Sequence, residues 1–389
     1  MSHFVRVPDT FATYAGIDLH TTSLSILAIP RRGEGKQRKT IPTHCTGRLL
    51  EFIRSLPRPL CIGIESMGSF YWLWDLLLPE VDELILLDAL DLSKMAPREA
   101  ATDRTIPARI AYAMRDARVP ACYVPAKKIR HLRQFGRQWR RITQTASRAK
   151  VQMRWQLHQN NCRGPRNITC ASIQRWMRAQ GHTLQAAPCF LMNNWQHVLF
   201  TCEEIRTNLR REMLAIVHGD PTLRHQLDIL TGARGIGDIL GTVILAEFAN
   251  FRRFKNADAV ACWTGLTQRS HVSNRQTYPG SISKAGSTTL RWALCEAAFE
   301  IACSDETYHQ TYQAIKSKTG HAAIAKTALA RRLSRYLWKA VVSDTPFRIG
   351  LSRKRTERAN QVRLRRHRRR KRLEEKIAQR ERNPRPTTV

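Results

Sequence analysis

The stretch YAGIDLHTTSLSILAI, residues 14–29, holds two apolar runs separated by a short polar turn, and the acidic residue Asp18 ends the first run. Apolar runs bounded by turn residues predict β-strands, here over residues 13–18 and 23–29. A carboxylate at the end of a buried strand costs free energy unless a cation or a hydrogen-bond donor pairs with it. Asp18 therefore either begins the turn that follows or belongs to a site that binds a cation.

The composition points to a polyanionic partner. The 389 residues include 65 Lys and Arg against 31 Asp and Glu, a formal net charge of +34, and such a surplus favours nucleic acid. No apolar run approaches the ~18 residues that span a bilayer, and the segment MSHFVRVPDT is unlike a signal peptide. The 10 cysteines form no C-x-x-C pair, so we expect reduced thiols and no structural zinc. The expected place is the cytoplasm of a bacterial or archaeal cell, at the nucleoid, with no membrane partner.

The first region, residues 13–125, predicts an α/β domain. Beyond the first two strands, strands are expected at residues 37–41, 60–65, 83–88 and 121–125, and helices at 47–56 and 69–78. Consecutive strands followed by strands that alternate with helices are typical of a mixed sheet with helices on its faces.

The second region, residues 126–227, predicts a long helix in a coiled coil. Apolar or small residues recur in steps of three and four from residue 129 to residue 157, which is the near-heptad seam of a helix that packs on another helix. A returning helix is expected near residues 203–217. An unpartnered seam exposes apolar surface, so the seam also favours a homo-oligomer, either a dimer or a tetramer.

The same region is strongly basic. From residue 117 to residue 202 there is no Asp or Glu, whereas a helix face that is merely solvated usually carries both signs. We therefore expect contacts with the phosphates of a nucleic acid, and the alternative is an ordinary basic surface. The candidate residues on the helix are Arg130, Arg133, Arg137, Arg140, Arg141, Arg148, Lys150 and Arg154.

The third region, residues 228–345, predicts a mainly α-helical domain, and residues 346–389 form a basic tail. Gly235 and Gly237 stand between two apolar segments, as in helix-hairpin-helix DNA-binding elements, where such glycines let backbone N–H groups approach a phosphate. A G-x-G turn also joins ordinary helices, so both interpretations stay open. The tail would add salt-sensitive affinity for nucleic acid that does not depend on base sequence.

Two acids mark one end of the predicted sheet. Asp18 ends the first strand and Glu65 ends the strand at residues 60–65. If these strands are neighbours, the carboxylates lie close together and raise one another's pKa unless a divalent cation keeps them ionised. Mg²⁺ prefers such oxygen ligands, and two ions in a site of this kind support phosphoryl transfer. The alternative is that Asp18 starts a turn and Glu65 caps the helix that follows.

Three motifs resemble one protein family. YAGIDLHTTSL, IGIESMGSFYW and ATDRT together are similar to the RuvC-type (RNase H-like) amino-terminal domain of the DEDD transposases of the insertion-sequence one-ten family, which are relatives of the pilin gene invertase. Residues 235–298 resemble the second conserved region of that family. The resemblance implies a DNA transposase or recombinase, a Mg²⁺ site of Asp18, Glu65 and Asp103, a serine nucleophile at Ser273 and a non-coding bridge RNA as guide.

The serine segment, GLTQRSHVSNRQT, leaves some assignments open. Ser270 is the competing nucleophile if the register differs by three residues. A serine hydroxyl needs an activating base, and His271 could serve if both residues lie on a strand, where residues two apart share a face. Positive charge on the scissile phosphate could come from Arg269, Arg275 and Lys284.

The third motif departs from the family pattern, in which a second acid follows three residues after the first. Here Ile106 and Pro107 follow Asp103, so the fourth ligand is absent from its place, and Pro107 predicts that a helix begins there. Asp88 is a possible substitute ligand, and Asp116 fits less well. The alternative functions are a catalytically impaired DNA- and RNA-binding derivative and a RuvC-like structure-selective nuclease.

Overall fold

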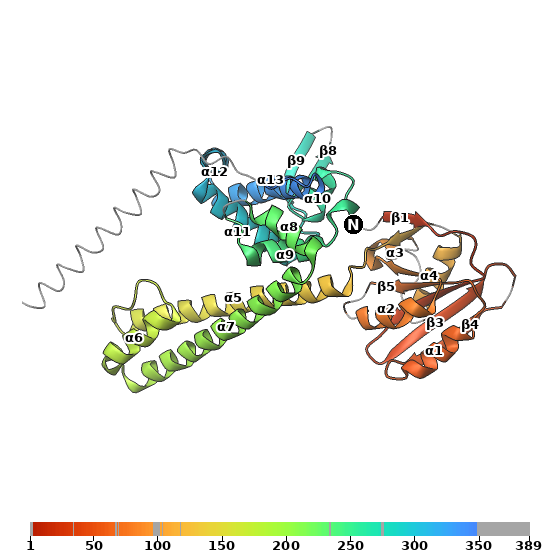
Figure 1. Ribbon diagram of the computed structural model, residues 1–389, viewed down its shortest axis with the longest axis horizontal. Helices are drawn as coiled ribbons and strands as arrows, with labels where there is room; N and C mark the ends of the chain where they lie inside the picture. Colours follow the sequence, from red (N-terminus) through yellow and green to blue (C-terminus); the bar gives the residue numbers. More distant parts are fainter. Residues whose placement is uncertain are drawn as a thin grey trace, which may run out of the picture. The chain divides into compact units, whose positions relative to one another are not determined.

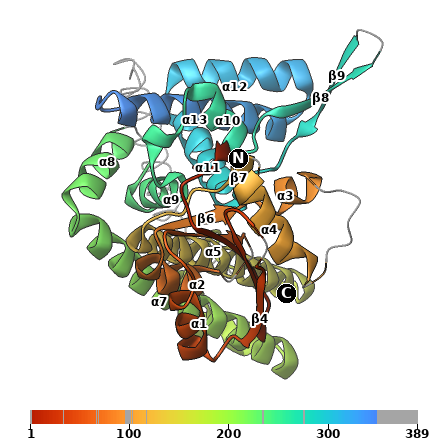
Figure 2. The same cartoon turned by 90° about the vertical axis from the view of Figure 1, so that its right-hand side faces the viewer.

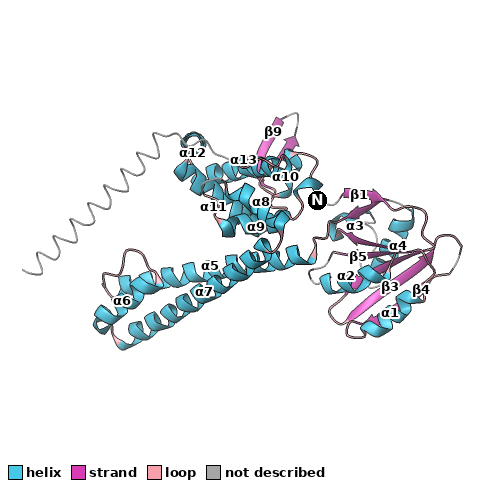
Figure 3. Ribbon diagram, in the orientation of Figure 1, coloured by secondary structure: helices cyan, strands magenta, loops and turns pink. Residues whose placement is uncertain are grey.

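The computed structural model describes residues 3–33, 35–66, 68, 70–95, 102, 104–116, 118–232, 235–273 and 276–347, without the side chains of residue 3 and residues 269–279. Asp103, Arg275 and the tail from residue 348 lie outside this description. The chain forms two compact units, Met1–Val124 and Pro125–Val389. The first is α/β and the second is mainly helical (Figure 1, Figure 3).

The first unit contains a seven-stranded mixed sheet of order β1-β7-β6-β5-β2-β3-β4. The strands are β1 (His3–Arg6), β2 (Thr13–Leu19), β3 (Ser23–Pro30), β4 (Gln37–Pro42), β5 (Leu60–Glu65), β6 (Glu83–Leu87) and β7 (Arg118–Ala121). β2, β5 and β6 are parallel, and β3 and β4 continue the sheet in antiparallel fashion from β2. The strands expected from apolar runs are confirmed, except that the last one precedes the expected residues 121–125.

Helices cover both faces of this sheet (Figure 2). α1 (Thr46–Arg54) and α2 (Tyr71–Leu77), which a 3-10 turn (Leu78–Glu80) extends, pack on one face through Leu49, Ile53 and Leu73. α3 (Ala89–Met95) and α4 (Thr105–Asp116) lie on the other face, where Ile110 and Met114 are fully buried. α4 begins two residues before Pro107, the expected start, because proline is tolerated in a first turn that needs no backbone N–H donor.

The second unit begins with a hairpin of two long helices, α5 (Lys127–Gln159) and α7 (Ala186–His218), joined through α6 (Cys170–Gln180) and a 3-10 turn (Gly181–Thr183). The two helices are antiparallel, since Ile129 and Leu132 share a core with Met213 and Val217, whereas Met153 shares one with Met192. The seam of α5 thus packs on α7 of the same chain. The returning helix covers the seam, so the seam gives no reason to expect a homo-oligomer.

The rest of this unit is a helical domain with one β-hairpin. Its helices are α8 (Pro221–Thr231), α9 (Asp238–Phe248), α10 (Ala257–Trp263), α11 (Thr288–Ser304), α12 (Glu306–Thr319) and α13 (Ala322–Val342), with a 3-10 turn at Phe251–Arg253. β8 (Gln268–Ser273) and β9 (Gln276–Ile282) form the hairpin. α9 is buried from Gly241 to Phe248 and lies at the centre of the core. Within the described residues, no helix is both long and apolar enough to cross a membrane.

Candidate active site and nucleic-acid contacts

Asp18 and Glu65 are neighbours at the carboxyl ends of two parallel strands. Ile17 of β2 pairs with Ile64 of β5, so the next residue of each strand is one of the two acids. Only 2% of Asp18 is exposed, and Glu65 is half-buried. Burial and the charge of Asp18 raise the pKa of Glu65, which is the mutual effect expected of two close carboxylates. The structure therefore brings together the first two acids of the predicted site.

A histidine completes this end of β2. Nε2 of His20 lies 3.1 Å from Oδ2 of Asp18. The charge of the imidazole of His20 acts to lower the pKa of Glu65. Sequence reasoning missed His20, although the signal was present. It lies two residues after Asp18, and that spacing places two side chains on the same face of an extended chain.

α4 approaches the acids closely because glycines face it. Gly16 of β2 pairs with Gly63 of β5. A Cβ on Gly16 would lie 2.1 Å from the carbonyl oxygen of Pro107, and one on Gly63 would lie 2.6 Å from Cγ2 of Ile110. This contact brings the positive charge of Arg109 to Glu65, whose pKa it acts to lower. No local pattern in the sequence indicates this role for Arg109.

The start of α4 carries the third motif. Thr102 and Thr105 exchange hydrogen bonds, each hydroxyl accepting from the other backbone N–H at 2.9 and 3.2 Å, in the manner of a capping box. Asp103 lies outside the described residues. Ile106 is half-buried and packs on the apolar cluster beneath α4. This position therefore contributes packing to the core and has no oxygen to offer a metal.

The two substitute acids lie elsewhere. Asp88 accepts a hydrogen bond from the backbone N–H of Asp91 at 3.1 Å, as a helix cap does, and Cys122 Sγ lies 3.8 Å from it. Leu87 pairs with Glu65 in the sheet, so the next residue, Asp88, belongs to the opposite face. Asp116 forms a two-bond ion pair with Arg115. The structure brings neither acid to Asp18 and Glu65.

The donor set near Asp18 suits a hard cation. Two adjacent carboxylates supply the oxygen ligands that Mg²⁺ prefers. Burial and, after it, the charge of Asp18 raise the pKa of Glu65, and a bound cation would offset both effects. Within the part of the chain that the structure describes, no group of three or more His, Cys, Asp or Glu side chains is arranged to hold a metal. The described residues thus provide two carboxylate ligands.

A basic groove runs along the outer side of α4. A cavity of about 560 Å³ is lined by residues that include Arg38, Arg104, Arg109 and Tyr112. Arg38 Nη1 donates to the carbonyl oxygen of Arg104 at 3.0 Å, and Lys36 lies 5.5 Å from the centre of the Tyr112 ring. Arg109 lines this groove and also acts on the pKa of Glu65, so it links the groove to the charges around the acidic pair.

The serine segment forms the β-hairpin of the second unit. Ser273 is the last residue of β8 and pairs with Gln276, so it lies at the distal end of the hairpin. Ser270 lies three residues earlier and pairs with Pro279. His271 and Ser273 are two apart on one strand, which is the backbone condition for His271 to act as base. The side chains of Arg269, Ser270, His271 and Ser273 lie outside the description, as does all of Arg275.

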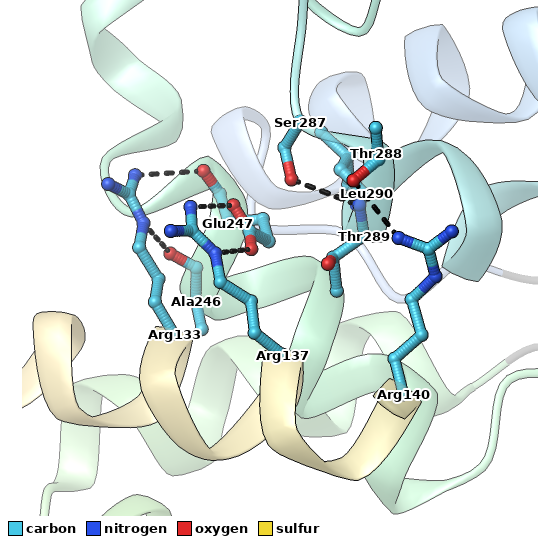
Figure 4. A network of polar contacts seen from close by, with 9 residues as sticks. All are labelled: Arg133, Arg137, Arg140, Ala246, Glu247, Ser287, Thr288, Thr289 and Leu290. Atoms are coloured by element: carbon cyan, nitrogen blue, oxygen red, sulfur yellow. Dashed lines mark hydrogen bonds and ion pairs between the residues drawn. The ribbon is translucent and has the colours of Figure 1, made fainter. Parts of the chain in front are cut away.

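The arginines of α5 fall into two groups. Arg133 donates to the carbonyl oxygens of Ala246 and Glu247 at 2.8 and 3.0 Å, and Arg137 forms two hydrogen bonds with the carboxylate of Glu247, at 3.0 and 3.3 Å (Figure 4). Glu247 is only 2% exposed, so these arginines hold α5 against the end of α9. Arg130 is also buried. The exposed group on the distal half of the helix comprises Arg141, Arg148 and Arg154, with Lys150 partly exposed.

The G-x-G turn joins α8 to α9. Gly235 has φ +100°, and a Cβ there would lie 2.9 Å from the backbone nitrogen of Ile301, so packing against α11 already requires glycine. Gly237 precedes the first turn of α9, and a Cβ there would meet nothing within 4 Å. The two glycines thus differ, since only Gly237 leaves room for a ligand.

Comparison with known proteins identifies the class. Residues 227–313 match the family described as "Transposase IS116/IS110/IS902 family". The chain is 25% identical to a "Probable family 20 transposase" of Pseudomonas aeruginosa over 346 residues, which cover 86% of this chain and 98% of the relative. It is also 26% identical to a "Putative transposase y4pF/y4sB" of Sinorhizobium fredii over 118 residues, 29% of this chain and 30% of that protein.

These similarities support a transposase of an insertion sequence. The family expected from the sequence motifs is confirmed as the one that this chain resembles: its residues 227–313 match the IS116/IS110/IS902 transposases, the group that contains IS110.

Proposed function

We propose that this transposase cuts and joins DNA as a site-specific recombinase, with a Mg²⁺-dependent acidic site in its first unit and a serine nucleophile in its second. The observation that carries the proposal is the side-by-side position of Asp18 and Glu65 at the carboxyl ends of β2 and β5. Strands β4-β3-β2-β5-β6, with two antiparallel and two parallel neighbour pairs, support a RuvC-like sheet.

The acidic site acts through its carboxylates. Asp18 and Glu65 would hold Mg²⁺ together with Asp103, and the ion would supply positive charge to a phosphate and lower the pKa of a bound oxygen nucleophile. His20 orients Asp18 through their 3.1 Å contact. Arg109 offsets negative charge at Glu65 and also lines the basic groove. With Ile106 in place of the fourth acid, a second ion has fewer ligands.

The serine site acts by nucleophilic attack on a phosphodiester. The hydroxyl oxygen of Ser273 would attack the phosphorus and form a phosphoserine bond as the bond from phosphorus to one sugar oxygen breaks, while His271 accepts the hydroxyl proton. The proton taken up by His271 then passes to the departing sugar oxygen, and Arg269 and Arg275 offset the charge on the phosphate. Lys284 follows the opposite end of the hairpin, where its backbone N–H donates to Gly265, so it has no part in this step. Ser273 ends its strand at the distal end of a two-stranded hairpin, a backbone position that supports its role as the residue that attacks a nucleic-acid backbone.

We also propose that a bridge RNA selects the DNA and that two or more copies of the chain act together. Support comes from the net charge of +34 and from the exposed Arg141, Arg148 and Arg154, which offer phosphate contacts that need no base sequence. Exchange of two strands requires at least two nucleophiles, which favours a dimer or a tetramer.

Covalent trapping tests the proposal. Native protein is mixed with RNA transcribed from its flanking DNA, nicked DNA and Mg²⁺, and a protein–DNA adduct is sought after denaturation. We expect an adduct with native protein, its loss in Ser273→Ala and Asp18→Asn, and its retention in Ser270→Ala. An adduct that persists in Ser273→Ala and disappears in Ser270→Ala would move the nucleophile to Ser270.

One observation favours a second function, that of a nucleic-acid-binding protein without cleavage. Ile106 packs on the core of the first unit where the family carries an acid. This alternative predicts that native protein binds DNA and RNA but forms no adduct, and that Ile106→Asp restores one. Cleavage of branched DNA that survives Ser273→Ala would instead indicate the structure-selective nuclease.

A further inference from the structure

Two arginines from different helices meet at the start of α11. Arg140 of α5 donates through Nη1 to Oγ1 of Thr288 at 3.0 Å (Figure 4). Arg291 of α11 donates through Nη1 to the carbonyl oxygens of Gly286 at 2.6 Å and Lys284 at 3.1 Å. Both guanidinium groups therefore contact the segment from Lys284 to Thr288, which leads out of the β-hairpin into α11.

These two charges repel each other. Burial and the charge of Arg140 lower the pKa of Arg291, although the guanidinium stays protonated at neutral pH. In the part of the chain that the structure describes, neither arginine forms an ion pair with a carboxylate. One turn earlier on α5, Arg137 has the buried Glu247 as its counterion. A bound anion would supply the counterion that this pair of arginines lacks.

The loop that holds the pair is fixed by packing. A Cβ on Gly286 would lie 2.1 Å from the carbonyl oxygen of Trp263, and one on Gly265 would lie 2.8 Å from the backbone nitrogens of Ala285 and Gly286. Lys284 has φ +56°, a left-handed conformation that is unfavourable for lysine. The side chain of Lys284 is exposed two residues after the hairpin ends. The loop thus presents Lys284 as a third cation beside Arg291, since the guanidinium of Arg291 donates to the carbonyl oxygen of Lys284.

We infer that Arg140, Arg291 and Lys284 form a binding site for one backbone phosphate of a nucleic acid, at the foot of the β8–β9 hairpin. The two guanidinium groups supply directed N–H donors and Lys284 supplies a mobile charge. The inference rests on the proposed function for the identity of its partner. A phosphate held here would fix the backbone a short distance along the chain from the hairpin that carries Ser273.

Salt-dependent binding tests the site. Labelled duplex DNA and labelled single-stranded RNA, both of random sequence, are titrated with full-length native protein, Arg140→Gln and Lys284→Gln over a range of KCl concentrations. Loss of one phosphate contact lowers the slope of log K against log salt by about 0.9 for duplex DNA and about 0.7 for a single strand. Arg224→Gln, on an exposed position of α8, removes the same charge elsewhere and serves as control.

A carboxylate placed between the arginines gives a second test. Thr288→Asp supplies the missing counterion, so it should raise Tm by ~2–4 °C and weaken nucleic-acid binding at least tenfold at low salt. Thr307→Asp makes the same substitution near the start of α12, at an exposed position, and should leave binding within about twofold. Opposite changes in stability and binding are not expected of a purely structural arginine pair.

The outcomes separate the site from the proposed chemistry. A reduced slope on DNA alone assigns the phosphate to DNA, and a reduced slope on RNA alone assigns it to RNA. Native slopes in Arg140→Gln and Lys284→Gln, with Thr288→Asp also binding like native protein, overturn the inference. If the Ser273-dependent adduct still forms in those variants, the proposed function stands without this site. Loss of the adduct in Ser273→Ala has no bearing on the slopes.

Discussion

Gly16 on β2 lies directly beside Gly63 on β5, and α4 packs across both. Two adjacent positions without a Cβ let the helix backbone come close to the sheet, which brings Arg109 to the carboxylate of Glu65. The acidic pair therefore depends on a packing contact two residues before each acid.

Replacing Gly16 by alanine tests this contact. The new Cβ meets the carbonyl oxygen of Pro107, so α4 must move outward, and we expect a loss of ~1–3 kcal/mol in the free energy of unfolding. Urea unfolding followed by circular dichroism measures it. Gly47→Ala, on α1 where a Cβ meets nothing within 4 Å, is the matched control and should be neutral or stabilising by up to ~1 kcal/mol. Equal effects of the two variants would contradict the close approach.

The ion pair between Arg137 and Glu247 predicts a second effect on stability. Arg137→Met leaves the buried carboxylate of Glu247 without its two hydrogen bonds. Because Arg137 is half exposed, we expect ~1–3 kcal/mol of destabilisation, less than for a fully buried pair. The double variant with Glu247→Gln should regain part of the lost stability, because the buried side chain is then uncharged. Thermal unfolding is the measurement, with Arg141→Met on the exposed side of α5 as control.

Asp220 predicts a pH dependence. Its carboxylate accepts from Lys128 and from the backbone N–H groups of Leu223 and Thr222 at the start of α8, and these bonds lower its pKa below the ordinary 3.8. A lowered pKa stabilises the folded state above the unfolded value and loses that contribution as the pH falls through the folded value. We expect Asp220→Ala to cost ~1 kcal/mol at pH 7.

This cost should shrink as the pH is lowered below 3.8. Denaturant unfolding of native protein and of the variant across that range gives the difference at each pH. Asp220→Asn keeps a capping side chain and loses the charge. Its free energy of unfolding at pH 7 should therefore lie between those of native protein and Asp220→Ala. A cost that stays constant down to the lowest pH would show that ionisation of Asp220 contributes nothing.

Metal binding predicts a change in thermal stability that needs no turnover. Mg²⁺ should raise the Tm of native protein, because a cation bound by Asp18 and Glu65 binds the folded state selectively. Removal of the ion with a chelator should reverse the rise, and Asp18→Asn should abolish it. Asp116→Asn, which removes an exposed acid already paired with Arg115, should respond like native protein. A rise of equal size in Asp18→Asn would place the bound ion elsewhere.

The sequence by itself determined the elements that are set by local pattern. Apolar runs on either side of a polar turn predict β2 and β3, and steps of three and four from residue 129 predict α5, because both patterns are written in consecutive residues. It also placed Asp18 and Glu65 at strand ends. Parallel strands that are neighbours bring such ends together, so the acidic pair could be predicted from two local runs.

Only the tertiary structure decided which distant residues meet. Sheet register puts Asp88 on the face opposite Glu65, and the length of α7 determines that the seam of α5 is covered within the chain. Arg137 and Arg140 look alike in the sequence, yet one meets the carboxylate of Glu247 and the other meets Thr288 beside Arg291. The physical reason is that the charge partner of a side chain can be more than 100 residues away along the chain, as Glu247 is from Arg137. No local periodicity records such a contact.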